Sequence, residues 1–236
     1  MDDWRIGNIW VTRILEMCDP LGTPSEWFPD CTDEALEPHL HWLTPRLISP
    51  ATGRLILPIQ SFLVRTGHHT ILVDSCVGND KTCAYFPHWH RRNDGTFLAR
   101  LANAGVAPEQ IDYVLCTHLH IDHCGWNTRL VDGRWIPTFP NARYIMARRE
   151  FEAAQAASGD ADERTYQDNV LPIVEAGRAV LVGWRSVAGA DAGPHPGARS
   201  HRPEISRRRG SVFRRSHALA DAMHIPRLEL SVRHGP

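Results

Sequence analysis

Three histidines and one aspartate lie within six residues of one another near the middle of the chain: His118, His120, Asp122 and His123. Imidazole nitrogen and carboxylate oxygen are the donors that zinc and its first-row neighbours bind in proteins. Alternate side chains of an extended segment point to the same side, so we expect His118 and His120 to bind one ion. Asp122 and His123 would face a second ion beside it. The spacing predicts a binuclear metal site that activates a shared water, and the alternative is a polar loop with surface histidines.

A predicted sheet must position this cluster. Residues 111–116 form an apolar, β-branched run of strand length, which places the cluster where a strand gives way to a loop. Before it, Ile59–Val64 and Thr70–Asp74 predict a hairpin, with His68 and His69 solvated at its tip. Thr96–Ala104 predicts an amphipathic helix that Gly105 ends.

Further elements follow the cluster. Residues 142–146 and 178–182 predict strands. Residues 147–157, which are good helix formers, predict one helix, and residues 163–176 predict another that Gly177 ends. A tight turn is expected at residues 131–134.

Before the hairpin, residues 6–16 predict a strand, and residues 23–43 predict a loop with short helical turns. The aromatic and histidine residues of the loop at residues 83–93 fit two interpretations equally: a loop that lines the entrance to a substrate site, or a packed surface loop.

The pattern His-x-His-x-Asp-His after a strand resembles that of the metallo-β-lactamase-fold hydrolases. This resemblance implies an α/β fold, the αββα sandwich, with two zinc ions at the sheet edge, although other first-row divalent metals could serve. It implies that His118 and His120 bind the first zinc and that Asp122 and His123 bind the second. Asp122 would also be catalytic, because it orients the attacking hydroxide. Asp74 would brace the metal loop by hydrogen bonds from behind the ligands.

Two other metal-binding families fit the pattern less well. Flavodiiron oxidoreductases share the fold but carry His-x-Glu-x-Asp, so His120 argues against them. Barrel amidohydrolases use His-x-His on their first strand, without the Asp-His that follows here.

Length and composition set further limits. The chain has 236 residues, 42% of them hydrophobic, and a net charge of −1, which suits one domain with a sizeable core. The start predicts no signal peptide, and no apolar run approaches the ~18 residues of a membrane span. Six cysteines without a C-x-x-C pair fit a reducing cytoplasm. Of these, Cys124 is expected to pack behind the metal loop rather than to bind metal.

The C-terminal part has a different composition. Residues 183–236 hold ten arginines, no lysine and four acidic residues, whereas the rest of the chain holds 16 basic and 23 acidic groups. Periodicity also ends there. A polybasic arm that binds nucleic acid is one interpretation. It is weak, since no stacking aromatic residues are interleaved with the arginines, and we expect no nucleic-acid partner.

A shift of reading frame explains this tail better. Within the family resembled, a Thr-Pro-Gly-His segment and a later Gly-Asp segment should follow. When residues 191–199 are back-translated and read from the second base of the Asp191 codon, the permitted string is T-P-G-H-T-P-G-H-V. The same shift over residues 212–220 permits F-S-G-D-L-M-H-S-P, and over residues 225–230 it permits Y-P-D-W-N-S. We therefore predict a frameshift near residue 183.

These observations define the expected organisation and function. Residues 1–182 would form the N-terminal part of a metallo-β-lactamase-like domain with an arm at 1–50, and residues 183–236 an out-of-frame tail. The predicted function is a binuclear zinc hydrolase that uses a metal-bound hydroxide on an ester, lactone or phosphoester, on the lactonase and organophosphate-hydrolase side of the family. The alternative is a truncated, non-catalytic product that binds metal weakly or not at all. The expected partner is a small-molecule substrate, and no membrane association is expected. The arm is compatible with a homodimer.

Overall fold

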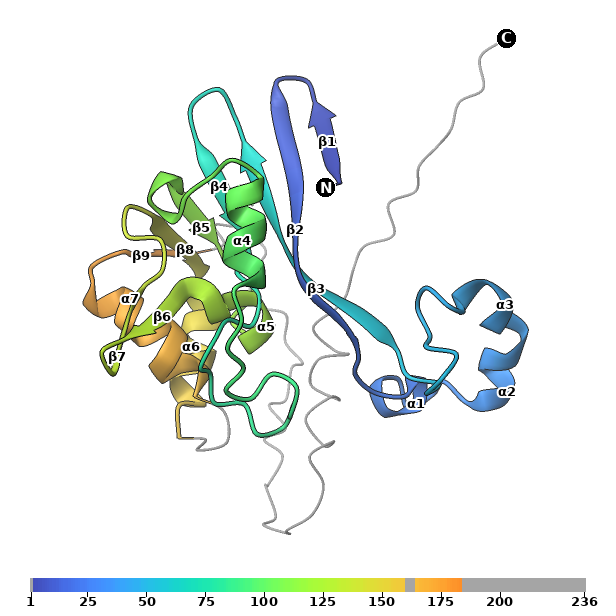
Figure 1. The fold of residues 1–236 in the computed structure, drawn as a ribbon. Coiled ribbons are helices and arrows are strands. Elements are labelled where there is room, and N and C mark those ends of the chain that lie inside the picture. The colour runs from blue at the N-terminus through green and yellow to red at the C-terminus, as the bar shows by residue number, and fades with distance from the viewer. Residues whose placement is uncertain (1, 160–163, 184–236) are drawn as a thin grey trace, which may run out of the picture.

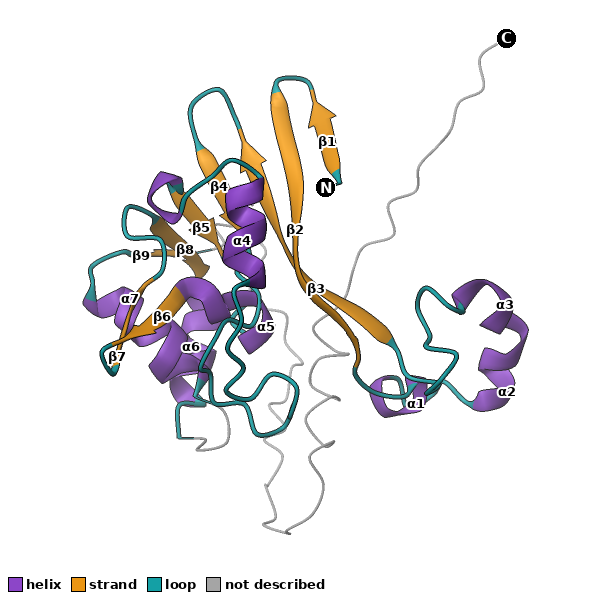
Figure 2. Ribbon diagram, in the orientation of Figure 1, coloured by secondary structure: helices purple, strands orange, loops and turns teal. Residues whose placement is uncertain are grey.

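The computed structural model describes residues 2–159 and 164–183. Its main sheet has the strand order β1-β2-β3-β4-β5-β8-β9 (Figures 1 and 2). The strands are β1 (Asp3–Ile6), β2 (Ile9–Pro20), β3 (Ile56–Arg65), β4 (Thr70–Val73), β5 (Tyr113–Leu115), β8 (Arg143–Ala147) and β9 (Ala179–Val182). Strands β1 to β4 pair antiparallel, and β4, β5, β8 and β9 pair parallel.

Helices connect the parallel strands, as crossovers between parallel strands require. The principal ones are α4 (Thr96–Asn103), α6 (Arg148–Ala156) and α7 (Leu171–Glu175). Short elements carry the loops between them: η2 (Pro108–Gln110), α5 (Ile121–Cys124), η3 (Gly125–Asn127), the hairpin β6 (Thr128–Val131) with β7 (Arg134–Pro137), and η4 (Tyr166–Val170).

The core lies between the sheet and these helices. Alternate strand residues point into it and are fully buried: Leu63 of β3, Leu72 of β4, Val114 of β5 and Tyr144 of β8. Phe97 and Leu101 of α4 and Ile173 of α7 meet them from the helical side. The period-two burial is the pattern expected of strands with one face in a core. The other face of the sheet is only partly covered.

Most of the predicted elements are confirmed, with changed boundaries. The strand predicted over residues 6–16 is confirmed as β2 but begins only at Ile9, because Gly7, at a φ of +61°, turns the chain from an additional strand, β1. The helix predicted over residues 163–176 is divided into a wide π-turn (η4) and the short α7. Pro172 lies in the first turn of α7, where its missing N–H removes no helical hydrogen bond.

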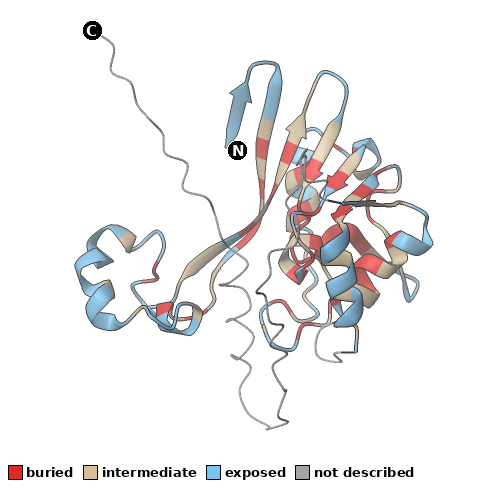
Figure 3. Cartoon of the chain, turned by 180° about the vertical axis from the view of Figure 1, so that it is seen from behind, coloured by how far each residue is buried: buried red, intermediate tan, exposed pale blue. Residues whose placement is uncertain are grey.

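The predicted arm differs most from expectation. Residues 3–20 belong to the main sheet, and only the segment between β2 and β3 projects from it (Figure 1). That segment carries α1 (Pro24–Trp27), α2 (Asp33–Leu36), η1 (Glu37–His39) and α3 (Leu40–Leu43). These helical turns are mostly exposed (Figure 3). We call residues 21–55 the projecting arm.

Two further predictions concern the C-terminal tail and a membrane-spanning helix. Of the tail predicted at residues 183–236, residues 184–236 lie outside the described residues. Within the part that is described, no helix combines the length and apolar character that crossing a bilayer requires.

Candidate metal centre

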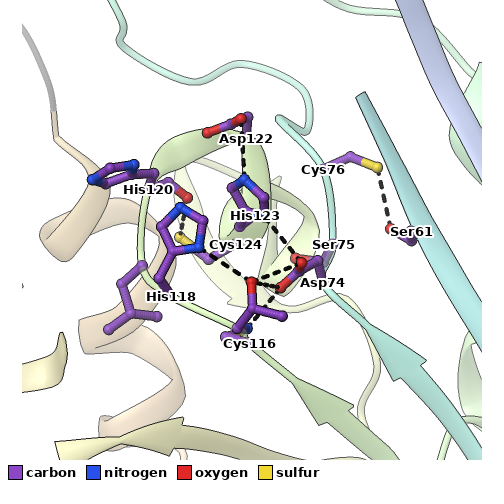
Figure 4. A network of polar contacts seen from close by, with 12 residues as sticks. Ser61, Asp74, Ser75, Cys76, Cys116, His118, His120, Asp122, His123 and Cys124 are labelled. Carbon is purple, nitrogen blue, oxygen red and sulfur yellow. Dashed lines mark hydrogen bonds and ion pairs between the residues drawn. The ribbon is translucent and has the colours of Figure 1, made fainter. Parts of the chain in front are cut away.

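Two loops at the carboxyl ends of β4 and β5 form the centre (Figure 4). Asp74 and Cys76 adopt positive φ values of 58° and 50°, which turn the chain sharply as it leaves β4. Backbone hydrogen bonds then fasten this loop to α5 and η3: Ser75 N to His123 O at 2.8 Å, Gly125 N to Cys76 O at 2.7 Å, and Trp126 N to Ser75 O at 2.8 Å. Backbone hydrogen bonds therefore hold together the two loops that carry the candidate ligands.

The first two candidate ligands lie side by side. Leu119 is buried, whereas His118 is half-buried and His120 exposed, so the alternation predicted for this segment is present. Their ring centroids are 4.6 Å apart. The pKa of His118 lies below its ordinary value, because burial and the neighbouring His123 and His120 disfavour its charged form. A neutral imidazole is the form that binds metal.

His123 stands between two carboxylates. Its Nδ1 lies 2.9 Å from Asp74 Oδ2, and its Nε2 lies 3.2 Å from Asp122 Oδ2. Burial opposes its charged form, but the hydrogen bonds to Asp122 and Asp74 prevail and raise its pKa to about 9. Burial likewise opposes the charged form of Asp122, yet His123 holds the pKa of that carboxyl below its usual range.

Asp74 forms hydrogen bonds with several groups of the centre. It accepts hydrogen bonds from Thr117 N at 2.8 Å and from Thr117 Oγ1 at 2.9 and 3.0 Å, besides its bond to His123. Thr117 Oγ1 in turn lies 3.1 Å from His118 Nδ1. One buried carboxylate thus contacts His123 directly and His118 through a single threonine. Asp74 therefore lies where the family resemblance implies a bracing residue, and its effect on metal binding stays a prediction.

The donors fit zinc in kind and in proximity. The rings of His118 and His123 are 3.9 Å apart, with His120 and Asp122 beside them. Within residues 2–159 and 164–183, however, no three His, Cys, Asp or Glu side chains already form a metal cage. Both nitrogens of His123 face carboxylates, those of Asp74 and Asp122. Its contact with Asp122 would have to open for both to bind a metal.

A close backbone approach sets the position of α5. A Cβ added to Gly125 would lie 1.7 Å from the carbonyl oxygen of Val77, and one added to Gly78 would lie 2.7 Å from the carbonyl carbon of Gly125. Real Cβ atoms do not approach that closely, so both positions require glycine. Gly78 also has a φ of +78°.

Sequence reasoning missed Glu16 of β2, whose side chain is fully buried beside this loop. It accepts hydrogen bonds from Val77 N at 2.9 Å, Gly78 N at 3.2 Å and Trp126 Nε1 at 2.7 Å. The Arg92 guanidinium lies 3.2 Å away. Burial raises the pKa of Glu16 even against these partners. The available signal was a glutamate flanked by Ile14, Leu15 and Met17 in a predicted strand.

Sequence reasoning also missed Lys81, the only lysine of the chain, which is 1% exposed. Its Nζ donates to Thr128 Oγ1 at 2.7 Å and to Thr128 O at 3.1 Å, and it lies 3.5 Å from the centre of the Trp135 ring. Burial lowers the pKa of Lys81 to about 7. The lysine ties the loop after β4 to the β6–β7 hairpin.

The burial of other side chains bears on the remaining predictions from the sequence. Cys124 is fully buried and its thiol donates to His120 O at 3.1 Å, so it packs behind the loop as predicted. His68 and His69 are exposed, and His69 lies 3.8 Å from Asp112. In the loop at residues 83–93, Trp89 is 2% exposed and packs on Phe86 at 4.4 Å, which favours a packed loop there.

Comparison with known families gives one match that spans most of the chain. The family model described as the metallo-beta-lactamase superfamily matches residues 55–206. That range contains the whole centre, from Asp74 to His123.

Two curated relatives are N-acyl homoserine lactonases. The one called AttM, from Azorhizobium caulinodans, is 31% identical over 109 residues, which are 42% of this chain and 37% of the relative. The one from Bacillus cereus is 30% identical over 121 residues, which are 44% of this chain and 42% of the relative. The match thus spans less than half the length of these relatives.

Solved structures share the fold. A probable metal-dependent hydrolase from Staphylococcus aureus aligns with a TM-score of 0.58 at 20% identity, over 79% of this chain and 64% of that one. The hydrolase AbOPH, of the beta lactamase superfamily, aligns with a TM-score of 0.58 at 23% identity, over 77% and 60%. At these identities the likeness speaks for the architecture alone.

Proposed function

Because the chain belongs to the metallo-beta-lactamase superfamily, we propose that its function is metal-dependent hydrolysis of a small ester-like substrate, with two zinc ions and a lactone as the favoured combination. The observation that carries the proposal is the gathering of His118, His120, Asp122 and His123 above one buried carboxylate. The curated relatives are named as N-acyl homoserine lactonases, which supports a lactone over other esters.

The roles of the side chains follow from their positions. His118 and His120 would hold one ion, and Asp122 and His123 a second. Bound zinc would lower the pKa of a water molecule and polarise the substrate carbonyl. Asp122 would accept a hydrogen bond from that water and so orient it. Asp74 would fix the ring of His123 and, through Thr117, that of His118.

A non-catalytic product is the second candidate, and one observation favours it. Among the described residues no three such side chains form a metal cage, and two of the candidate ligands, Asp122 and His123, contact each other instead. If the frameshift is real, the ligands encoded beyond it are missing as well. An ion held by two protein ligands would bind weakly.

Zinc titration with paired histidine variants tests the site. We expect the chain to bind zinc, and we expect His118→Ala combined with His120→Ala to abolish the tighter binding step. The matched control is His68→Ala combined with His69→Ala, which removes two exposed histidines at a hairpin tip. Equal zinc binding by both double variants would refute the assignment.

Proton release on ring opening of an N-acyl homoserine lactone tests the reaction. Zinc-loaded protein should open the lactone and the His118/His120 double variant should not. Turnover that survives removal of all metal would sink the proposal. Stoichiometric zinc without turnover on lactones, aryl esters or phosphotriesters would favour the non-catalytic product.

A further inference from the structure

The ring of His120 is held differently from the rings of the other two candidate histidine ligands. Thr117 Oγ1 lies 3.1 Å from His118 Nδ1, and Asp74 Oδ2 lies 2.9 Å from His123 Nδ1. In the part of the chain that the structure describes, no side chain forms a hydrogen bond with the ring of His120, which is exposed (Figure 4). Its orientation therefore depends on the backbone that carries it.

That backbone is held on both sides of His120. After it, His120 O accepts hydrogen bonds from His123 N at 3.0 Å, from Cys124 N at 3.2 Å and from Cys124 Sγ at 3.1 Å. Before it, Leu119 N donates to Glu150 Oε2 at 3.3 Å. Among the described residues no other acceptor contacts this N–H. The carboxylate of Glu150 is thus the one hydrogen-bonding partner of the residue that separates the two candidate ligands.

Glu150 reaches Leu119 from a fixed element. It lies in the first turn of α6, which begins directly after β8. A carboxylate is favourable at that end of a helix. Phe151 and Ala154 of the same helix pack against the core cluster, and Glu150 itself is half-buried. The sheet and the helix, rather than a free loop, therefore set the position of this carboxylate.

Two carboxylates hold one short segment from two neighbouring strands. Asp74 follows β4 and accepts the N–H of Thr117, and Glu150 follows β8 and accepts the N–H of Leu119. Strands β4 and β8 lie on either side of β5, from which the segment leaves the sheet. The two candidate ligands of the first ion alternate with these two anchored residues. Partners that orient metal ligands in this way matter for metal affinity.

We infer that Glu150 is a positioning residue of the metal centre. By accepting the N–H of Leu119, its carboxylate fixes the backbone between the two candidate ligands and so sets the ring of His120 beside that of His118. The role in metal binding rests on the proposed function. The contact between the two rings, whose centroids are 4.6 Å apart, can be measured on metal-free protein.

Other roles of a carboxylate make different demands. A direct metal ligand or a purely electrostatic partner needs the negative charge. A positioning residue needs an acceptor oxygen at the right distance from the N–H. Substitution separates the two: Glu150→Gln keeps the length and an acceptor oxygen but removes the charge, whereas Glu150→Asp keeps the charge and shortens the side chain by one methylene group.

The zinc affinity of these variants, measured by competition with a chelating dye, is the first test. We expect Glu150→Asp to weaken the tighter binding step about 10- to 100-fold, and Glu150→Gln to bind zinc nearly as tightly as the parent chain. Glu152→Asp is the matched control, because Glu152 is an exposed residue of the same helix. Should Glu150→Asp fold poorly, the comparison of Glu150→Gln with Glu150→Ala decides in its place.

Nuclear magnetic resonance of the metal-free chain is the second test. The ring protons of His118 and His120 should show a mutual nuclear Overhauser effect in the parent chain and in Glu150→Gln, and Glu150→Asp should lose it. The amide proton of Leu119 should exchange with solvent several-fold faster in Glu150→Asp than in Glu152→Asp, because its acceptor has been withdrawn.

Three results would overturn the inference. The first is a Glu150→Asp variant that binds zinc as tightly as the parent chain. The second is a Glu150→Gln variant that loses as much affinity as Glu150→Asp, which would assign the effect to the charge. The third is a ring contact and a Leu119 exchange rate that Glu150→Asp leaves unchanged. A parent chain that binds no zinc, but whose ring contact depends on Glu150 as expected, would count against the proposed function alone.

Discussion

At the scale of single residues, the centre depends on a carboxylate that is not itself a candidate ligand. Asp74 is 8% exposed and contacts Thr117 and His123 from a positive-φ position. Asparagine tolerates that backbone conformation and nearly matches the shape of aspartate, so Asp74→Asn removes the charge while keeping the turn.

We predict that Asp74→Asn weakens zinc binding about 10- to 100-fold, the usual effect of losing a partner that orients a ligand. Competition with a chelating dye measures it. Asp112→Asn is the control, because the exposed Asp112 also accepts a backbone N–H, from Thr70 at 2.8 Å, but lies away from the centre. Equal affinities in the two variants would show that Asp74 braces nothing.

Lys81 supplies a prediction on pH. Its pKa in the folded chain is about 7, whereas an unfolded chain keeps a lysine near ~10.4. Between these values the unfolded chain binds more protons, so this residue makes the free energy of unfolding rise with pH. Below pH ~7 both states are protonated and its contribution is constant.

Lys81→Met should therefore be at least as stable as the parent chain near neutral pH and should lose that advantage as the pH rises toward ~9. Urea unfolding of both chains at several pH values measures the difference. Arg91→Met, at an exposed neighbouring cation, should show no such trend. A difference between Lys81→Met and the parent that does not vary with pH would contradict the assignment.

At the scale of elements, the loop after β4 and helix α5 behave as one unit. Three backbone hydrogen bonds and the contact of Gly125 with Val77 join this loop to α5 and to η3, which directly follows it. Gly125→Ala should lower the free energy of unfolding by about 1–3 kcal/mol, since the added methyl group must displace backbone. It should also weaken zinc binding, because α5 carries Asp122 and His123.

Chemical denaturation and zinc titration of Gly125→Ala check this. Gly95→Ala is the matched control, since a Cβ there would meet nothing within 4 Å and its φ is not positive. A Gly125→Ala variant as stable as Gly95→Ala would mean that the two loops can move apart freely.

At the scale of the whole molecule, stability is distributed unevenly. The central strands β4, β5 and β8 bury Leu72, Val114 and Tyr144 completely. Helices α2 and α3 of the projecting arm bury no residue at all. Regions with few buried apolar contacts open at low free-energy cost.

Amide hydrogen exchange should reflect this contrast. We expect residues 33–43 to exchange within the first time points and the amides of β5 and β8 to be the slowest. Protection of the arm equal to that of β8 would show that another surface covers the arm in solution.

The sequence was most informative where one local pattern determines the structure. Apolar, β-branched runs of strand length predicted the strands, and the spacing of His118, His120, Asp122 and His123 predicted that these four side chains would lie together. Glu16, Gly78 and Gly125 escaped notice, because their importance comes from contacts between distant parts of the chain, such as that of Glu16 with Trp126. The hairpin at Gly7 was missed although its signal is local, since Gly7 and Asn8 form a two-residue turn between the paired residues Ile6 and Ile9.

The contact between Gly78 and Gly125 has a consequence for how this centre can change over time. Both positions exclude any larger residue, since the space that a side chain would occupy is filled by peptide groups. Exchanging one candidate ligand for another leaves the backbone around the centre in place, whereas enlarging either glycine displaces the backbone that positions Asp122 and His123. Random mutagenesis should therefore find altered metal preference more readily than any tolerated change at these two sites.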